Sequence, residues 1–283
     1  MTTVAKGTGK DTGAAATDPS PARPRSARRT RGQLSPTTKW ALRLASVLAI
    51  AVAWELYGNA INPVLLSSPT AIIGATFEMI ADGTLTKAMG ESFVVLGVGS
   101  LMGVTAGLVI GLAAGRNQVI STLIELPLNA LYATPTVALI PVIVVWFGFG
   151  PTAKTVVVTL FVLFPVLINT MRGVQEVDRD LVEVARSFCS GERRMWFDLI
   201  LPSALPYVVT GLRLAIGRAL IGIIVAEFFT AFSGLGYLIV TNANSFRTDR
   251  TFVPILVIAA LGVLVTALLE FVERRVVRWS ARD

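Results

Sequence analysis

Histidine is absent from the 283 residues, and cysteine occurs once, at Cys189. The lack of imidazole excludes histidine-ligated metals, histidine general bases and an HExxH-type intramembrane hydrolase. A single thiol cannot form an intrachain disulfide, and nothing in the sequence points to a metal that it could bind. We therefore expect no metal site and no catalytic residues, and we interpret Cys189 as a small packing residue.

A phosphate-cradling G-x-x-x-x-G-K-[ST] loop is also missing. The nearest approach, GTGKDT at residues 7–12, has Val4 where the first glycine must be and Asp11 after the lysine. We therefore expect that the chain binds no ATP and carries no cofactor of its own.

Charge is scarce and apolar residues are abundant. Charged residues make up 15% of the chain and hydrophobic residues 53%, a balance typical of a polytopic membrane protein rather than a soluble domain. The net charge is +7, but the basic residues are scattered over short segments between apolar runs instead of gathering on one surface. This scatter argues against a nucleic-acid partner and indicates a topology signal in a lipid bilayer.

Residues 1–36 are rich in Ala, Thr, Pro, Lys and Arg and lack apolar periodicity. We expect them to form a disordered, basic, cytoplasmic tail, and residues 37–283 to form one transmembrane domain. A signal peptide is not expected, because the basic region leads into an apolar segment long enough to span and lacks a small-residue cleavage site.

Six stretches are candidate membrane spans, each near the roughly 20 residues that a bilayer core requires. They are residues 40–60, 92–114, 123–147, 154–171, 212–232 and 252–272. The fifth contains Arg213 and Arg218, which we expect near its interfacial end, snorkelling toward headgroups. The alternative is that these arginines face an anionic solute.

The distribution of Lys and Arg predicts the orientation. With the amino terminus inside, the outer segments hold only Lys87, Lys154, Arg247 and Arg250, and all other basic residues outside the spans are cytoplasmic. This asymmetry favours a multi-pass protein of the plasma (inner) membrane with both termini cytoplasmic.

Between the first two spans, the sequence LSSPTAIIGATFEMIADG predicts a short helix that begins with Ser68 as cap and Pro69 as first residue. Ile72, Ile73, Phe77 and Ile80 are expected to share one face. Such a helix can rest at the outer interface or pack as an extramembrane helix, and the pattern fits both.

In the second span, glycines recur at positions 99, 103, 107, 111 and 115. Steps of four residues place them along one side of a helix, where bare backbone allows another helix to approach closely. We therefore predict tight helix packing rather than a ligand role.

The third span contains Pro127, Pro135 and Pro141. Prolines bend a helix and free carbonyls that need a polar partner or a water-filled cavity, so this span is our candidate for the wall of a translocation path, with a kinked, buried helix as the alternative. The polar candidates for the path are Asn129, Tyr132, Thr134, Thr136 and, from the fifth span, Glu227. Glu227 is flanked by apolar residues and is therefore costly unless it faces a cavity or a partner.

A charged segment, residues 175–202, interrupts the apolar pattern and must project into water. Asp180 followed by Glu183 predicts a capping-box-like helix start, and Gly191 predicts its stop. A second short helix is expected from Glu192 to Leu201, ending before Pro202. On the first helix, one face is predicted to carry Leu181, Val184, Ala185 and Phe188. This helix-turn-helix elbow exposes an apolar face too small to form a core, as in helix-in-groove recognition.

The elbow resembles the EAA loop of permease subunits of binding-protein-dependent ABC importers, E-A-A-x3-G-x9-I-x-L-P. Glu183, Ala185, Leu201 and Pro202 match that pattern, Val184 and Leu199 replace Ala and Ile, and Cys189 stands where the glycine belongs. Gly191 is expected to take over the sharp turn. Further stretches are similar to the nitrate, sulfonate and taurine branch of these permeases, over about residues 40–280: ATPTVALIPVIVVWFGFG, LPSALPYVVTGLRLAIGRALIGIIVAEF and SGLGYLI.

The resemblance implies an all-α polytopic membrane protein of six transmembrane helices, with the type I ABC importer permease fold and an EAA-type coupling loop at residues 175–206. Implied partners are cytoplasmic ABC ATPase subunits, which bind the ATP, an extracytoplasmic solute-binding protein and a second permease copy, as a homodimer. Glu183 and Ala185 are expected in the ATPase cleft, Leu181 and Phe188 beside them and Arg186 at its rim. The other residues of the expected coupling surface are Asp180, Val184, Cys189 and Gly191.

The cargo implied by the branch is a small anion such as nitrate, a sulfonate, taurine or an aromatic acid. Relatives on the same scaffold carry vitamin precursors or other organic solutes, which leaves a second cargo class open. A secondary transporter or channel would leave the charged elbow unexplained and needs its own ion site. A membrane-embedded enzyme is disfavoured by the missing histidines.

Overall fold

The computed structural model describes residues 35–230 and 232–276. Of the tail expected at residues 1–36, residues 1–34 lie outside the described residues, and Pro36 is the first residue of α1. The chain divides into two units, residues 1–48 and 49–283. In the first unit, the described part is the beginning of α1, where the Ser35 hydroxyl lies 2.7 Å from that of Thr37. All further description concerns the second unit.

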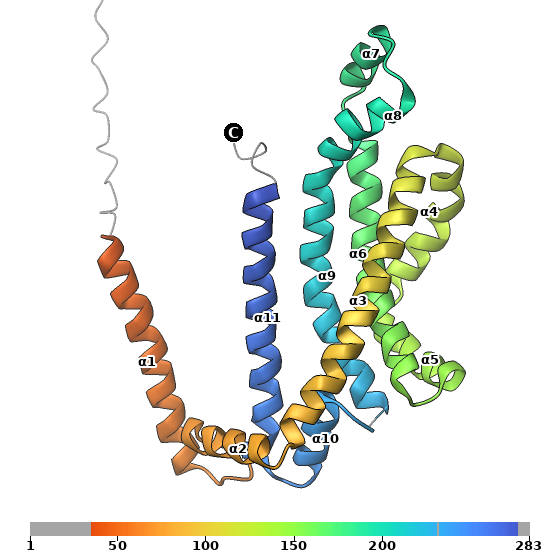
Figure 1. Ribbon diagram of the computed structural model, residues 1–283. Helices are drawn as coiled ribbons and strands as arrows, with labels where there is room; N and C mark the ends of the chain where they lie inside the picture. Colours follow the sequence, from red (N-terminus) through yellow and green to blue (C-terminus); the bar gives the residue numbers. More distant parts are fainter. Residues whose placement is uncertain (1–34, 231, 277–283) are drawn as a thin grey trace, which may run out of the picture. The chain divides into compact units, whose positions relative to one another are not determined.

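Regular structure in the described residues is helical throughout, as the sequence predicts (Figure 1). The elements are α1 (Pro36–Ala60), α2 (Pro69–Ala81), α3 (Thr84–Arg116), α4 (Gln118–Ala133), η1 (Thr136–Leu139), α5 (Ile140–Phe147), α6 (Pro151–Gln175), α7 (Arg179–Ser187), α8 (Glu192–Met195), η2 (Trp196–Ile200), α9 (Leu201–Thr230), α10 (Leu235–Asn244) and α11 (Thr248–Val276). Among these described residues, α1, α3, α6, α11 and the run from α8 to α9 are five helices long and apolar enough to cross a membrane.

The glycine ladder of α3 packs against α6, confirming the predicted close approach. A Cβ added at Gly103 would lie 2.7 Å from the Cβ of Val162. The remaining rungs repeat this clash, with Gly99 on Val158, Gly107 on Val166, Gly111 on Thr170 and Gly115 on Val174. Two rows with the same four-residue step therefore interlock along both helices, and only glycine lets the backbones come this close.

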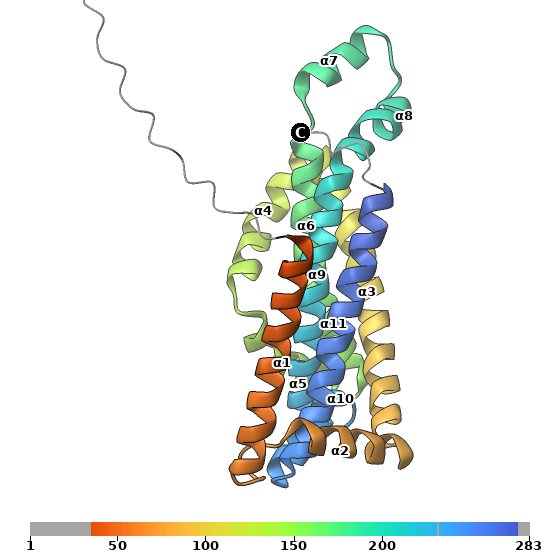
Figure 2. The same ribbon diagram turned by 90° about the vertical axis from the view of Figure 1, so that its left-hand side faces the viewer.

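Helix α9 also packs on α6 with glycines of one helix against side chains of the other. α6 is therefore flanked by α3 and α9 (Figures 1 and 2). Gly173 of α6 lies against Tyr207, and Gly222 of α9 lies against Phe161. α6 runs unbroken through Pro165. In its most apolar segment, 56% of the residues are buried. It is the central helix of this unit.

The predicted third span is not one kinked helix. α4 and the η1–α5 pair meet at a bend of 91° around Pro135. Thr134 is extended, with φ −73° and ψ 129°, because the ring of a following proline disfavours helical backbone at the residue before it. Pro127 lies inside α4 and Pro141 is the second residue of α5, so one proline of the three breaks the helix. Counting the bent pair as one span gives six.

The second short helix of the elbow was predicted to end before Pro202, and this prediction is wrong. α8, the π turn η2 and α9 form one continuous helix from Glu192 to Thr230. In η2 the N–H of Leu201 bonds to the carbonyl of Trp196, five residues back. This widened turn accommodates a proline that has no N–H and would clash with the carbonyl four residues earlier.

Helix α2 also differs in its faces. Ile72 is buried with Ala75 and Met79, whereas Ile73, Phe77 and Ile80 are exposed. Ile72 therefore does not share a face with the other three, because the helix packs on α11 and α3 through one side and leaves a second apolar side open. The packed-helix alternative is confirmed for the buried side of α2, and placement of the exposed side at the outer interface stays a prediction.

Candidate functional site

The elbow α7–α8 stands at one end of the helical unit, and α2 and α10 lie at the other (Figures 1 and 2). α7 begins at the N-cap Asp178, whose carboxylate accepts from the N–H of Asp180 at 2.9 Å. The predicted capping box of Asp180 and Glu183 is therefore wrong, because the true cap lies two residues earlier. Asp180 instead sits in the first turn, where a carboxylate favours the positive end of the helix dipole.

Cys189 itself makes the sharp turn after α7. Its φ is +52°, the left-handed region, whereas Gly191 has φ −64° and ψ 153° and is the N-cap of α8. The N–H of Ser190 bonds to the carbonyl of Ala185 at 3.0 Å, and that of Cys189 to Arg186 at 2.8 Å. These two bonds form a Schellman motif, in which the left-handed position is ordinarily glycine. The expectation that Gly191 takes over this turn is overturned.

The apolar face of α7 is open. Phe188 is 82% exposed, Val184 52% and Leu181 49%, whereas Ala185 is half-buried. Glu183 and Arg186 are exposed beside them. A nine-residue helix with two large exposed apolar side chains, and a third on the C-cap residue Phe188, has the form of a ligand for a hydrophobic groove.

The base of the elbow is firmly attached to the bundle. Met195 and Ile200 are buried with Val174 of α6 and Ala204 of α9. The last residue of α3, Arg116, forms an ion pair with Glu192 and places its guanidinium 5.3 Å from the ring centroid of Trp196. The base of the elbow therefore contacts α3, α6 and α9.

The four path candidates of the third span lie together around its bend. Asn129 and Tyr132 are exposed on the last turns of α4, Thr134 is at the break and Thr136 opens η1. The hydroxyl of Thr134 donates to the carbonyl of Ala130 at 2.8 Å, and the N–H of Thr134 donates to the same carbonyl at 3.1 Å. Polar groups and bent backbone at one place are compatible with the wall of a water-filled path.

Glu227 is not brought together with these four. It is fully buried, with 0% of its surface exposed, and it holds the start of α10. One carboxylate oxygen accepts from the hydroxyl of Ser92 at 2.6 Å and the other from the N–H of Gly236 at 2.6 Å. The Ser92 oxygen in turn accepts from the N–H of Leu235 at 2.8 Å. In this conformation Glu227 closes the turn between α9 and α10.

Glycine is required around this carboxylate. Gly234 has φ +99°, and a Cβ there would overlap the Glu227 carboxylate. Beside it, the Lys154 ammonium donates to the carbonyl and the hydroxyl of Ser233 at 2.7 and 2.9 Å. Sequence reasoning identified Glu227 as unusual but missed Ser92, Lys154 and Gly234 as its surroundings. The SGLG pattern was the available signal.

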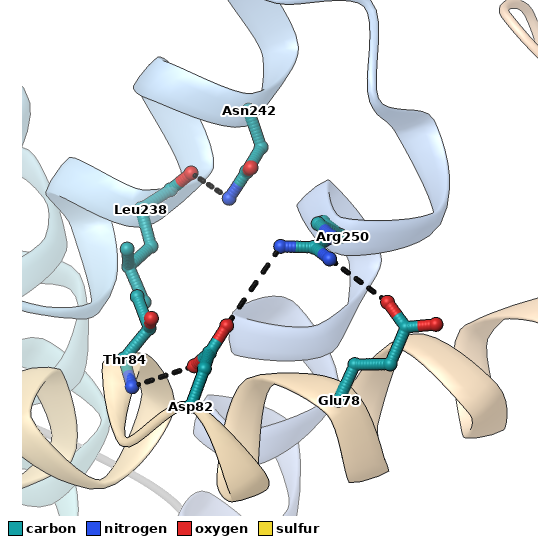
Figure 3. Close-up of polar contacts among 6 residues, drawn as sticks. All are labelled: Glu78, Asp82, Thr84, Leu238, Asn242 and Arg250. Carbon is teal, nitrogen blue, oxygen red and sulfur yellow. Dashed lines mark hydrogen bonds and ion pairs between the residues drawn. The ribbon is translucent and has the colours of Figure 1, made fainter.

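An ion-pair cluster ties α2 to α11 at the same end (Figure 3). Arg250 lies 2.8 Å from a Glu78 oxygen and 3.9 Å from Asp82. Asp82 also accepts from the N–H of Thr84 at 2.8 Å. Hydrogen bonding from Thr84, with the nearby charge of Arg250, holds the pKa of Asp82 below its usual value.

With this geometry described, comparison with known proteins gives three findings. The family model "Binding-protein-dependent transport system inner membrane component" matches residues 103–278. Putative aliphatic sulfonates transport permease proteins SsuC are similar: that of Escherichia coli (strain K12) is 34% identical over 255 residues, 87% of this chain and 95% of the relative, and that of Bacillus subtilis (strain 168) is 31% identical over 242 residues, 85% and 88%. The formylaminopyrimidine transport permease protein ThiX of Halalkalibacterium halodurans is 29% identical, over 83% of this chain and 94% of the relative.

Among solved structures, the crystal structure of an amino acid ABC transporter with histidines matches with a TM-score of 0.55. The match covers 70% of this chain and 97% of that one at 22% identity, a likeness of fold. It agrees with the predicted type I permease architecture.

Proposed function

Because the chain belongs to the family of binding-protein-dependent transport system inner membrane components, we propose that it is the membrane-spanning subunit of an ATP-driven importer for a small anionic solute. An extracytoplasmic binding protein delivers the solute. Two copies of the chain form the path, both termini lie in the cytoplasm, and ATP is bound by separate ATPase subunits. The chain itself carries out no chemical reaction.

The observation that carries this proposal is the elbow. Leu181 and Val184 of α7 and Phe188 directly after it are exposed, while Met195 and Ile200 of the α8–η2 base are buried against α6 and α9. We call α7 and the turn at Cys189 the knob. A knob that is exposed at its tip and packed at its base fits a groove in a partner that moves it. When ATP closes the ATPase pair, the knobs are drawn together and the attached helices rock between inward and outward openings.

The proposal assigns the following roles to the coupling residues. Glu183 and Ala185 sit in the ATPase cleft, Phe188 and Leu181 pack at its sides, and Arg186 lies at the rim. The left-handed turn at Cys189 ends the knob and directs the chain back toward the bundle. Asn129, Tyr132, Thr134 and Thr136 line the path at the bent third span.

A second cargo class is supported by one finding. ThiX, a formylaminopyrimidine transport permease protein, is nearly as similar to this chain as the sulfonate relatives. The same machinery with a neutral vitamin precursor as cargo is therefore the alternative. The ligand of the binding protein decides between the two.

The test of coupling uses two exposed phenylalanines. Phe188→Asp places a charge at the tip of the knob, and buried hot-spot aromatics typically contribute more than about 2 kcal/mol to an interface, so we expect co-purification with the ATPase subunits to fall at least tenfold. Glu183→Arg should have a similar effect. Phe197→Asp, on η2 and 62% exposed, is the matched control and should leave the complex intact.

Two results would contradict the proposal. One is undiminished ATPase binding by Phe188→Asp and Glu183→Arg. The other is solute uptake by the purified chain reconstituted alone, because that would make a nucleotide-hydrolysing partner unnecessary.

A further inference from the structure

A guanidinium lies inside the fifth span, against the bent third span. Arg218 of α9 donates from Nη2 to the Tyr132 hydroxyl at 2.9 Å, and its Cζ lies 5.0 Å from the centroid of that ring. The contact joins residues 86 positions apart in the sequence. Arg218 is therefore oriented by a cation–π contact and a hydrogen bond on the same aromatic side chain.

The depth of Arg218 differs from the expected interfacial placement. It lies 12 residues before Thr230, the last residue of α9, which is about 18 Å at 1.5 Å per residue. Arg213, five residues nearer the elbow, is exposed and better placed for the interface. A cation at the depth of Arg218 is expensive in lipid and marks a pathway or a partner by default.

The charge of Arg218 has no acidic partner in the described part of the chain, where no carboxylate lies within 4.0 Å of it. Its guanidinium has five N–H donors, and the Tyr132 hydroxyl takes one. The planar fork that remains matches the oxygens of a sulfonate, a carboxylate or nitrate in bidentate geometry.

The surroundings suit such a ligand. Tyr132 is 45% exposed, and Asn129 is exposed one turn earlier on α4. On α9, one turn to either side of Arg218, Leu214 and Ile221 are 51% and 56% exposed. Arg218 therefore offers a donor-rich centre framed by apolar side chains, which fits a charged head group with a short aliphatic tail.

We infer that Arg218, positioned by Tyr132, is the contact for the anionic head group of the solute, with the tail on Leu214 and Ile221. This inference rests on the proposed importer function and specifies its substrate chemistry: an oxyanion, with a sulfonate as the best match to a donor fork beside apolar surface. A neutral pyrimidine would leave the guanidinium unmatched.

The first test measures local charge without a solute or an ATPase. In a Cys189→Gly background, Asn129→Cys is labelled with a methanethiosulfonate that carries either a sulfonate or a trimethylammonium group. Removing a positive charge at short range slows the anionic reagent and speeds the cationic one, so Arg218→Gln should lower the ratio of anionic to cationic labelling by more than about tenfold. Arg218→Lys should keep the preference, and Arg213→Gln is the matched control that should leave it unchanged.

The second test measures uptake. The full importer, with its ATPase and binding protein, is reconstituted in vesicles and supplied with labelled ethanesulfonate. Arg218→Gln should lower uptake at least tenfold without loss of ATPase co-purification, and Arg218→Lys should fall between it and the parent because the fork is lost.

The outcomes separate the two proposals. An unchanged labelling ratio, or unchanged uptake, in Arg218→Gln overturns the anion site and leaves the importer function standing. A parent importer that shows the anionic labelling preference but no ATP-dependent uptake counts against the proposed function instead. An equal loss in Arg213→Gln would show a general effect of removing a cation from α9 and would also overturn the site.

Discussion

The two ends of the helical unit treat their polar and apolar groups in opposite ways. At the α2–α10 end, Glu227 is fully buried and accepts two hydrogen bonds, and Ile72 and Met79 are enclosed. At the α7 end, the carboxylate of Glu183 is in solvent and Phe188 is 82% exposed. The buried cluster at the first end is complete within the chain, although α2 also leaves Ile73, Phe77 and Ile80 exposed there, whereas the apolar face beside Glu183 has no such cluster around it. The difference assigns a stabilising role to the buried groups of the first end, and under the proposed function it leaves the second end to contact the ATPase.

The largest effect is expected from the buried carboxylate. Glu227→Ala removes the acceptor of the Ser92 hydroxyl and the Gly236 N–H and leaves a void, so we expect a loss of about 3 kcal/mol in the free energy of unfolding. Thermal unfolding in detergent measures it. Glu227→Gln should lose less, because it keeps one acceptor.

The control for this change is Glu125→Ala, an exposed carboxylate on α4, which should shift stability by less than about 0.5 kcal/mol. Equal melting of the two variants would show that the Glu227 cluster does not hold the α10 end. The contrast between the two ends would then lose its basis.

The next largest effect on stability is expected at the α3–α6 contact, which lies between the two ends. Gly103→Ala puts a Cβ 2.7 Å from Val162 and should destabilise by about 2 kcal/mol through overpacking. Gly97→Ala, on the same helix with nothing within 4 Å of the new Cβ, should be neutral or slightly stabilising. Equal thermal stability of the two variants would contradict the interlocked α3–α6 contact.

Much of this fold could be predicted from local sequence. Span length predicted the long helices, since a bilayer core requires about 20 apolar residues. The four-residue glycine step predicted the α3–α6 contact, because a helix places such residues on one side. The exposed face of α7 followed from the spacing of Leu181, Val184 and Phe188.

The errors arose where backbone geometry was shared between neighbouring elements. Pro202 was taken as a helix end, but a π turn carries the helix through it. Gly191 was expected to make the turn that Cys189 makes, because residue preference favours glycine over cysteine in left-handed backbone. Ser92 and Glu227 are 135 residues apart, so no local period could pair them. The contact of Tyr132 with Arg218 was missed for the same reason.

The elbow offers a smaller, local test. Cys189→Gly removes the cost of a side chain at φ +52° and should stabilise the α7 turn by about 1 kcal/mol. Amide hydrogen exchange at residues 185–190 should slow about fivefold, since 1.4 kcal/mol corresponds to tenfold in an equilibrium that governs local opening. Gly191→Ala, at φ −64° with nothing within 4 Å of the new Cβ, is the control. Faster exchange in Gly191→Ala than in the parent would indicate that Gly191, and not Cys189, determines the turn after α7.

The smallest effect concerns the pH dependence of stability at the rim of the α2–α10 end, by which we mean the ion pairs of Arg250 with Glu78 and Asp82. The pKa of Asp82 is lowered by hydrogen bonding from Thr84 and by Arg250, so the folded state prefers the ionised form. Its contribution to stability is present above the unfolded pKa, about 3.9, and is lost as the pH falls through the lower folded pKa. The melting temperature of the parent should therefore decline slightly more than that of Asp82→Asn between pH 5 and pH 3. Asp198→Asn, at the elbow end and 68% exposed in its side chain, should retain the decline of the parent. If Asp82→Asn declined as steeply as the parent, the rim ion pair would contribute nothing to the stability of that end, and the contrast would rest on the buried groups alone.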